Sequence, residues 1–507
     1  MAGPEPHIDK KDFDDATLQK RLLAALKGKG ERWTVADAVV ASGLPKLETE
    51  RALKVLSREF EGHLDVGESG EIVYRFPGGF VRRGQPTLGD RFAKVGAALY
   101  TAFKWFFKVW IMVTMIAYVA IFVALIVAAF VALTASNNNR SSGGRSSSSS
   151  GAGAAGGLLN LVARIFFWNA VFSDGRAYGY GYSAGRRSAG WDAAAGSSSR
   201  PQPRTKEERA ALGKEARPLY RKVFAFVFGD EDRIDPLADD RQILEYVRYL
   251  GGRVTASDLA LVTGWSVDRA DREITRLLAD YDGDARVTDE GALLYEFKGL
   301  LPSAQSGHGA PMPKFWERAD PEYKVSDNAS GTNWGIGVAN GFNLVMSFLT
   351  PSLLFPVLKM DPDVWTFWLS IFPAIFSGLF FLIPFVRAVG VARKNRLRAK
   401  RLALRGWYRW IAEHHERLSD EVPVDLRAAA PEAARLAPEA PGDAVASMAD
   451  EAAAALGGER SDQVVGSWQF GRLIRELAAA RAARLAAPKT EREVGAVVFT
   501  SETPDTN

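Results

Sequence analysis

The sequence predicts an α+β fold of winged-helix repeats combined with α-helical transmembrane segments, and therefore a multi-pass membrane protein. Three observations lead to this prediction. The stretch Val254–Phe297 has the order of elements of a winged helix, the stretch Thr34–Phe76 repeats it, and long apolar runs lie outside both. Repeats are identified before a fold is assigned, because each copy is one structural unit.

The stretch Val254–Phe297 begins with a strand-like run, continues with two short helices and ends with two short β runs. Asp282-Gly283 breaks the second helix, and Asp289-Glu290-Gly291 forms the turn between the β runs. A further helix is expected over Asp240–Leu250. We therefore predict that residues 207–300 form a helix followed by a winged helix.

The first copy is found by adding 221 to each residue number from Thr34 to Phe76, which reaches Thr255 to Phe297 without a gap. The identical residues include turn glycines and two aromatic residues of the last strand. In the first copy they are Thr34, Asp37, Gly43, Arg51, Leu56, Gly62, Val66, Gly70, Tyr74 and Phe76. Together with a helix over Thr17–Lys27, this copy predicts a winged helix at residues 16–77.

The end of the chain contains a weaker copy. Val422–Leu426 resembles the start of the repeat, Leu456-Gly-Gly458 the turn after its second helix, and Trp468-Gln-Phe470 its last strand. The middle is rich in alanine and proline and is several residues out of step. We predict a degenerate winged-helix-like domain over residues 413–500, with a final strand in Glu491–Thr500.

The first transmembrane segment is predicted within residues 96–135. Val109–Ala135 contains no charge, and about 20 apolar helical residues cross a bilayer core. The alternative, a buried core helix of a soluble protein, rarely runs this long without a charge.

Residues 334–386 are predicted to form a transmembrane hairpin with its tip at Lys359–Asp363. Prolines within both spans predict kinked helices, which membrane proteins tolerate when neighbours satisfy the freed carbonyls. Asn340 and Asn343 offer polar packing contacts to those neighbours.

Residues 136–206 are predicted to be a Ser/Gly-rich linker that holds an apolar aromatic helix at 158–172. The helix is short for a full span and has Arg164 in its middle. We still expect it to return across the bilayer, because the basic flanks of the other spans place both winged helices on the cytoplasmic side. The alternative is a re-entrant hairpin in the first apolar run. A second polar linker is expected at 301–332.

Residues 387–412 are predicted to form a basic juxtamembrane helix in which leucine and tryptophan are interleaved with arginine and lysine. Such a helix is expected to lie on anionic lipid, with about 1 kcal/mol contributed by each charge. The residues expected to contact lipid headgroups are Arg393, Lys394, Arg396, Arg398, Lys400 and Arg401. The alternative is a solvated basic helix that only fixes orientation, and both can hold.

Composition excludes several kinds of chemistry. The chain has 507 residues, a net charge of +4 and no cysteine, which excludes disulfides, thiolate metal sites and cysteine nucleophiles. Its five histidines form no spaced ligand set, and no phosphate-binding glycine loop, metal-binding helix motif or nucleophile elbow is present. We expect no enzyme activity, no catalytic residue, no metal and no cofactor.

A winged helix often reads DNA with its second helix in the major groove. Here the exposed charges of that helix sum to +1 in the first copy and to zero in the second. The wing tips carry Glu68, Glu71, Asp289 and Glu290, which repel the phosphates that dominate nucleic-acid affinity. We expect membrane lipids and a protein partner or self-association, and no nucleic acid.

The phrase Phe226-Val-Phe-Gly-Asp230, followed by a helix and a Gly-Gly-x-Val-Thr winged unit, resembles a family of uncharacterised multi-pass membrane proteins. The family occurs in cyanobacteria, other bacteria and plastids, and carries a Ser/Gly-rich, aromatic-rich stretch before the phrase. Some relatives bear an iron–sulfur assembly label, which this cysteine-free chain does not support. The resemblance covers the middle and last thirds of the chain and brings no catalytic signature.

The sequence thus predicts an integral scaffold of the cell (inner) membrane whose cytoplasmic winged-helix modules mediate protein–protein contacts without catalysis. The alternative is a membrane-tethered DNA-binding transcription regulator, because one fold hosts many functions.

Overall fold

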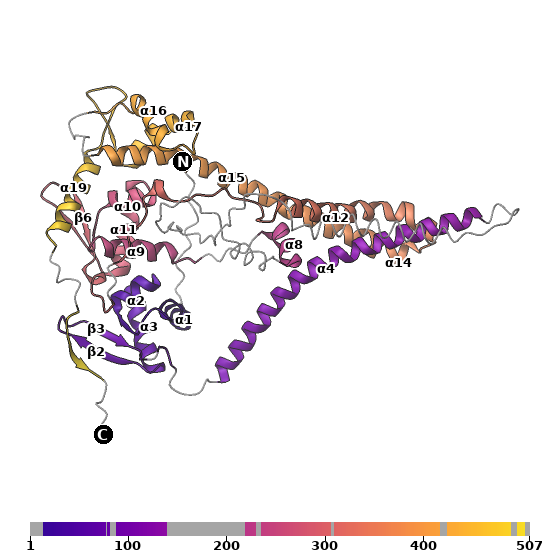
Figure 1. The fold of residues 1–507 in the computed structure, drawn as a ribbon, viewed down its shortest axis with the longest axis horizontal. Helices are drawn as coiled ribbons and strands as arrows, with labels where there is room; N and C mark the ends of the chain where they lie inside the picture. Colours follow the sequence, from indigo (N-terminus) through magenta and orange to yellow (C-terminus); the bar gives the residue numbers. More distant parts are fainter. Residues whose placement is uncertain are drawn as a thin grey trace, which may run out of the picture.

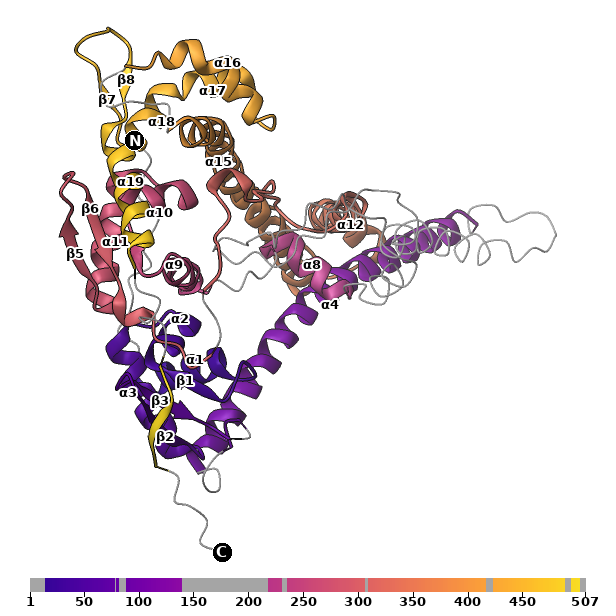
Figure 2. The same cartoon turned by 60° about the vertical axis from the view of Figure 1, so that its left-hand side comes forward.

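The computed structural model describes residues 14–77, 79–81, 88–138, 218–229, 235–305, 309–415, 423–487 and 494–501. Three units gather at one end of the molecule, and long apolar helices extend away from them (Figure 1). The units follow one another along one side, with the first at the bottom and the third at the top (Figure 2). The protein therefore combines mixed helix-and-strand units with a helical bundle.

The first unit combines three helices with a sheet in the strand order β1-β3-β2-β9. Its elements are α1 (Asp15–Leu26), β1 (Arg32–Thr34), α2 (Val35–Ser42), α3 (Lys46–Glu59), β2 (His63–Gly67) and β3 (Ile72–Arg75). Thr34 and Asp37 form a capping box that starts α2, and Gly43 ends the helix at φ 72°. Leu22, Leu53 and other side chains of α1 and α3 form its core with Trp33 of β1.

The second unit has the same sequence of elements and the strand order β4-β6-β5. They are α9 (Ala238–Tyr249), β4 (Arg253–Val254), α10 (Ala256–Thr263), α11 (Val267–Tyr281), β5 (Asp284–Val287) and β6 (Leu293–Glu296). Thr255 and Asp258 form the capping box of α10, and Gly264 ends it at φ 73°.

Strand register is also the same in these two units. Trp33 pairs with Tyr74 in the first unit, and Val254 pairs with Tyr295 in the second. Each pairing is shifted by the same 221 positions on both strands, so the ungapped sequence match corresponds to equal backbone geometry.

The third unit uses the end of α15 (Phe372–His414) as its first helix. An isolated bridge joins Val424 to Trp468, at the place of the first strand. The remaining elements are α16 (Leu426–Leu436), α17 (Gly442–Ser447), α18 (Ala449–Ala455), β7 (Glu459–Arg460), β8 (Trp468–Gln469) and α19 (Gly471–Leu485).

One glycine contact recurs in all three units. A Cβ placed on Gly62, Gly283 or Gly458 would lie 2.9, 2.8 or 3.0 Å from a ring carbon of the phenylalanine that follows the unit's last strand. Those rings belong to Phe76, Phe297 and Phe470. The glycine after the third helix is therefore needed to let this ring pack.

Two predicted boundaries of the C-terminal domain 413–500 are wrong. Its first helix lies before residue 413, because Trp407 and Ile411 of α15 are buried in its core. Its expected last strand, β9 (Val497–Thr500), leaves the unit and pairs with β2 of the first unit.

Three helical stretches of the described chain are long and apolar enough to cross a membrane, namely Ala98–Thr134, Ser330–Leu358 and Pro362–His414. The first lies in α4 (Leu88–Asn138), whose 51 residues span about 75 Å. The second comprises α12 (Ser330–Leu349), η4 (Thr350–Leu354) and α13 (Phe355–Leu358), and the third α14 (Pro362–Thr366), η5 (Phe367–Ile371) and α15. The hairpin tip turns at Lys359, with φ 53°. The described residues also include three short helices, α8 (Leu219–Phe228), η2 (Lys298–Leu300) and η3 (Phe315–Glu317).

The irregularity predicted from the prolines takes the form of two π-helical turns, η4 and η5. Phe355 donates its N–H to the Thr350 carbonyl, and Phe372 donates to the Phe367 carbonyl, each five residues back. Proline lacks an N–H and its ring clashes with the carbonyl four residues earlier, so a widened turn relieves the helix beside it.

The predicted polar contacts between the spans are present. The Asn340 side chain donates to the Ser377 carbonyl at 3.1 Å, and Asn343 donates to the Met115 carbonyl at 2.9 Å. Both asparagines are fully buried, so they tie α12 to α15 and to α4.

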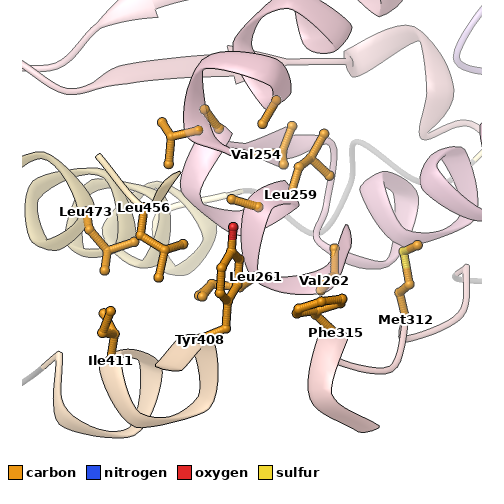
Figure 3. Close-up of a cluster of buried hydrophobic side chains, with 14 of the residues drawn as sticks. Val254, Leu259, Leu261, Val262, Met312, Phe315, Tyr408, Ile411, Leu456 and Leu473 are labelled. Carbon is orange, nitrogen blue, oxygen red and sulfur yellow. The ribbon is translucent and has the colours of Figure 1, made fainter. Parts of the chain in front are cut away.

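The largest hydrophobic core joins the second unit, the following linker and the third unit (Figure 3). Tyr408 and Ile411 of α15 point into it, and Phe315 of η3 stands beside the Tyr408 ring at a centroid distance of 5.2 Å. The Tyr408 hydroxyl donates to the Trp265 carbonyl at 3.0 Å. The end of α15 is therefore fixed within a core shared by two units.

Candidate functional site

The six residues predicted to contact lipid headgroups fall into two groups. Arg393, Lys394, Arg396 and Lys400 are exposed on α15. Arg398 and Arg401 are half-buried and bind the linker instead. Arg398 Nε donates to the Asp320 carbonyl at 2.6 Å, and Arg401 Nε to the Asp320 carboxylate at 3.1 Å.

The sequence predicts that this segment lies on anionic lipid together with its aromatic residues, and the part that concerns the tryptophans is wrong. α15 runs without interruption from Phe372 to His414, so the basic segment continues the third apolar helix. Trp407 and Trp410 belong to the core that includes the third unit, and Trp407 Nε1 donates to the Val445 carbonyl at 2.6 Å. Headgroup contact by the four exposed cations stays a prediction.

The short helix α8 lies where the units meet the bundle. Its Val223 and Val227 are buried against Ile111 of α4 and Phe380 of α15. At its C-terminal end, Arg387 of α15 donates to the Val227 carbonyl at 3.3 Å and to the Val325 carbonyl at 2.7 Å. One guanidinium therefore joins α8, the linker and the third span.

Gly229, in the phrase that carries the family resemblance, is required at this place for two reasons. Its φ is +85°, a conformation that other residues rarely adopt. A Cβ would also lie 1.9 Å from Arg387 Nη2. The phrase thus encodes the end of α8 and its contact with the third span.

Asp37 of the first capping box also joins the first unit to the second. Arg248 Nη1 of α9 donates to its carboxylate at 2.7 Å, and both side chains are buried. Ser303 Oγ donates at 2.7 Å and the Ala304 N–H at 2.9 Å. The carboxylate that starts α2 therefore also holds α9 and the linker after the second unit.

Asp258, the equivalent residue of the second capping box, has the same double role. Arg484 of α19 donates to its carboxylate and, through Nε, to the Arg253 carbonyl at 3.0 Å. Next to it, the Glu476 carboxylate accepts from the Ser257 N–H at 2.9 Å. In both units an arginine from outside the unit binds the capping aspartate.

These contact residues are not recognisable as partners from the sequence alone. The identity of Asp37 and Asp258 is a usable signal, because both positions carry the same capping aspartate. Arg248 and Arg484 give no signal, since each lies in another unit and more than 200 positions from the aspartate that it binds.

The helix after the first turn of each unit, α3 or α11, carries charges that are largely paired. Lys46 pairs with Asp282 at 2.7 Å across the two units, and this hydrogen bond lowers the pKa of Asp282. Lys54 of α3 pairs with Glu50 at 2.6 Å. On α11, Asp271 is bound by Arg472 of α19.

Comparison with known proteins finds one informative similarity. Over 409 residues the chain is 24% identical to an uncharacterised chloroplastic protein of Arabidopsis thaliana, and the match covers 75% of this chain and 69% of that protein. No protein family matches the chain, and no solved structure matches it. The similarity supports a distant relationship to an uncharacterised plastid protein and brings no activity with it.

Within the part of the chain that the structure describes, these contacts join the three units to one another and to the long apolar helices. Across the described ranges, no group of three or more His, Asp or Glu side chains is placed to hold a metal ion. The absence of enzyme activity and of a cofactor stays a prediction.

Proposed function

We propose that the protein is an integral, multi-pass membrane scaffold whose three units are winged-helix modules that bind protein partners or each other. One observation carries the proposal. The aspartate that caps a helix inside the first and second units is also the buried acceptor for an arginine from outside the unit. A unit that carries such a buried carboxylate acceptor at its contact surface is suited to protein–protein contact.

Support for the winged-helix interpretation comes from the order helix, strand, helix, helix, strand, strand. The last two strands of each unit form a hairpin, and the first strand pairs beside it. The third unit keeps the bridge and the glycine–phenylalanine contact but has shortened strands, as a degenerate copy would.

Support for protein partners over DNA comes from the charges of α3 and α11. A winged helix that reads DNA presents a basic second helix to phosphates and bases. Here Lys46 and Lys54 are paired with carboxylates, and so is Arg276 of α11. Few cations remain to bind phosphate, so affinity for DNA would be low.

The proposed location is the inner membrane, with all three units in the cytoplasm. The N-terminal end of α4 and the C-terminal end of α15 both lie on the side of the bundle that is next to the units (Figure 1). That end carries the basic residues of α15, and lysine and arginine next to spans are retained in the cytoplasm.

The positions of α4 and α8 along the bundle also bear on how many times the chain crosses the membrane. α4 ends at Asn138 at the far end, whereas α8 lies at the unit end, so the chain returns between them (Figure 1). Our candidate for the return is the predicted aromatic segment 158–172, which lies outside the described residues. Reporter fusions at Ser148, Gly190 and Ser306 should be external, internal and internal, and an external signal at Ser306 contradicts the shared compartment.

Similarity to a chloroplastic protein supports membership of the family of multi-pass membrane proteins that occurs in cyanobacteria, other bacteria and plastids. The relative is itself uncharacterised, so this membership adds no partner.

The test is affinity capture of the full-length protein after detergent extraction from its native membrane. We expect a stoichiometric partner or a second copy, retained at moderate salt. Recovery of neither would overturn the scaffold proposal. The same preparation is passed over duplex DNA at low and high salt, and strong retention at low salt only would favour the membrane-tethered regulator.

A further inference from the structure

A row of polar side chains lies on one face of α12 and η4, inside the bundle of long apolar helices. Its members are Asn340, Asn343, Ser347 and Thr350. Their spacing of three or four residues places them on the same side of the helix over about 15 Å. Ser377 of α15 lies beside this row, in contact with Asn340. All five side chains are fully buried, and we call them the polar seam.

Four oxygen atoms of the polar seam have no hydrogen-bond partner in the part of the chain that the structure describes. They are Asn340 Oδ1, Asn343 Oδ1, Thr350 Oγ1 and Ser377 Oγ. The remaining member is satisfied, because Ser347 Oγ donates to the Leu344 carbonyl at 2.6 Å. Most buried polar atoms are paired with protein or with ordered water, since burial without a partner is costly. Four such atoms in one row therefore indicate a polar ligand.

The two amides of the seam are held in one orientation. Asn340 Nδ2 donates to the Ser377 carbonyl at 3.1 Å, and Asn343 Nδ2 donates to the Met115 carbonyl at 2.9 Å. A reversed amide would place its own oxygen against that carbonyl oxygen, and neither atom can donate. Both Oδ1 atoms are therefore fixed as acceptors that need a donor from elsewhere.

The unpaired atoms together offer both kinds of hydrogen-bonding group. The amide oxygens of Asn340 and Asn343 accept, whereas the hydroxyls of Thr350 and Ser377 can donate or accept. A water molecule donates two hydrogen bonds and accepts others, and a buried water typically makes about three. The seam therefore has acceptors for the hydrogens of a water molecule and donors for its oxygen.

The absence of charge around the seam favours an uncharged ligand. Residues 98–134, 330–358 and 364–386, which form the long apolar helices, include no aspartate or glutamate. A cation would therefore lie in an apolar bundle without a carboxylate to offset its charge, which is costly. An anion would meet two amide oxygens that can only accept. Full burial of the seam also restricts the ligand to a small molecule.

We propose that the polar seam is a binding site for ordered water molecules, which bridge α12 to its neighbours in the bundle. The direct hydrogen bonds from Asn340 and Asn343 join α12 to α15 and to α4 through the amide nitrogens alone. Bound water adds bridges through the amide oxygens and the hydroxyls, and such bridges are nearly as favourable as direct hydrogen bonds. This inference goes beyond the scaffold function, and its failure would leave that proposal unaffected.

The substitution Ser377→Ala distinguishes a hydrated seam from a dry one by the sign of its effect. It removes a hydroxyl that makes no hydrogen bond within the described protein. In a hydrated seam this hydroxyl binds water, so its loss should make amides of α12 and α15 exchange roughly fivefold faster. In a dry seam the same change removes an unpaired buried atom and should leave exchange unchanged or slower. The measurement is hydrogen exchange followed by mass spectrometry on the full-length protein in detergent.

Two variants and a change of salt accompany it. Ser352→Ala makes the same substitution at an exposed serine whose Oγ donates to the Leu349 carbonyl, and it reports the effect of alanine itself on the helix. Thr350→Val removes another unpaired oxygen and nearly keeps the side-chain shape, and it is read by the same sign if Ser377→Ala does not fold. Each protein is measured in sodium chloride and in choline chloride at equal ionic strength.

Faster exchange in Ser377→Ala than in Ser352→Ala, equal in both salts, supports bound water. Unchanged or slower exchange in Ser377→Ala overturns the proposal, because the seam is then dry. An effect that appears in sodium chloride and not in choline chloride also overturns it, in favour of a bound cation. So does an experimental density map that resolves ordered water elsewhere in the bundle and none within hydrogen-bond distance of Asn340 Oδ1 and Ser377 Oγ.

Discussion

Replacement of Asp37 by alanine tests whether the capping carboxylate holds the first and second units together. The substitution removes the cap of α2, which contributes about 1 kcal/mol. It also removes the acceptor of Arg248 Nη1, whose side chain is 7% exposed; the hydrogen bond from Arg248 Nε to the Leu300 carbonyl at 2.7 Å remains. Loss of one partner from a buried ion pair costs about 3–5 kcal/mol. We therefore expect a local destabilisation of at least about 4 kcal/mol.

Hydrogen exchange followed by mass spectrometry measures this cost where it arises. Amides of α2 and α9 exchange through local opening, and each 1.4 kcal/mol changes the rate about tenfold. The expected change is roughly a thousandfold in these helices. Global unfolding is a poor readout here, since a chain of several units with membrane spans does not unfold in two states.

Two variants make the result specific. Asp258→Ala should cost about 1–2 kcal/mol, because Arg484 is 24% exposed and stays solvated after the pair is broken. Asp37→Ala combined with Arg248→Met should recover part of the loss, since no buried charge is then left alone. A change below threefold in α2, or a double variant less protected than Asp37→Ala, would refute the reasoning.

Three further predictions concern the bundle and the surface of the units. Gly229→Ala should release the end of α8. An alanine at this position would have to adopt a φ of +85°, and its Cβ would lie 1.9 Å from Arg387 Nη2. Faster proteolysis beside α8 in detergent would report the release. Asn343→Ala removes the hydrogen bond to α4 and should weaken the contact between α12 and α4 by about 1–2 kcal/mol, measured as faster hydrogen exchange in these two helices. The hydrogen bond from Lys46 lowers the pKa of Asp282 below its unfolded value, so the pair's stabilisation is present above that value and is lost as the pH falls through the folded pKa. Asp282→Asn should therefore cost less than about 1 kcal/mol at pH 7 and nothing at pH 2, as measured by exchange in α3.

The local features of the first two units were predictable from sequence. A threonine three residues before an aspartate marks a capping box, as at Thr34 and Asp37. A glycine nine positions after that threonine, here Gly43, marks the end of a short helix. These signals depend on neighbours in the chain, so an ungapped offset of 221 was sufficient to place both units. The long apolar helices were predictable for a similar reason, because hydropathy is a local property.

Contacts between distant parts of the chain were not predictable from one sequence. β9 is a short run without charges, and its sequence pattern predicts pairing only with strands that are close to it in the chain. It pairs instead with β2, more than 400 positions away. The basic segment after the hairpin misled for another reason. A run of cations with interleaved tryptophan is typical of a lipid surface, and the structure uses the same pattern for a helix with solvent on one face and the third unit on the other.

The continuity of α15 connects the membrane part to the units more directly than a linker would. Its 43 residues extend about 65 Å, from the hairpin to the core around Tyr408. Arg387 ties it to α8 at the base of the bundle, and Arg401 ties it to the linker through Asp320. A tilt of the third span therefore moves the third unit with it, and the Arg484–Asp258 and Arg248–Asp37 contacts pass that movement to the second and first units. With these helices in a membrane, as proposed, we expect units joined in this way to keep a fixed orientation relative to it, which suits the proposed scaffold better than a tethered reader that must search for its site.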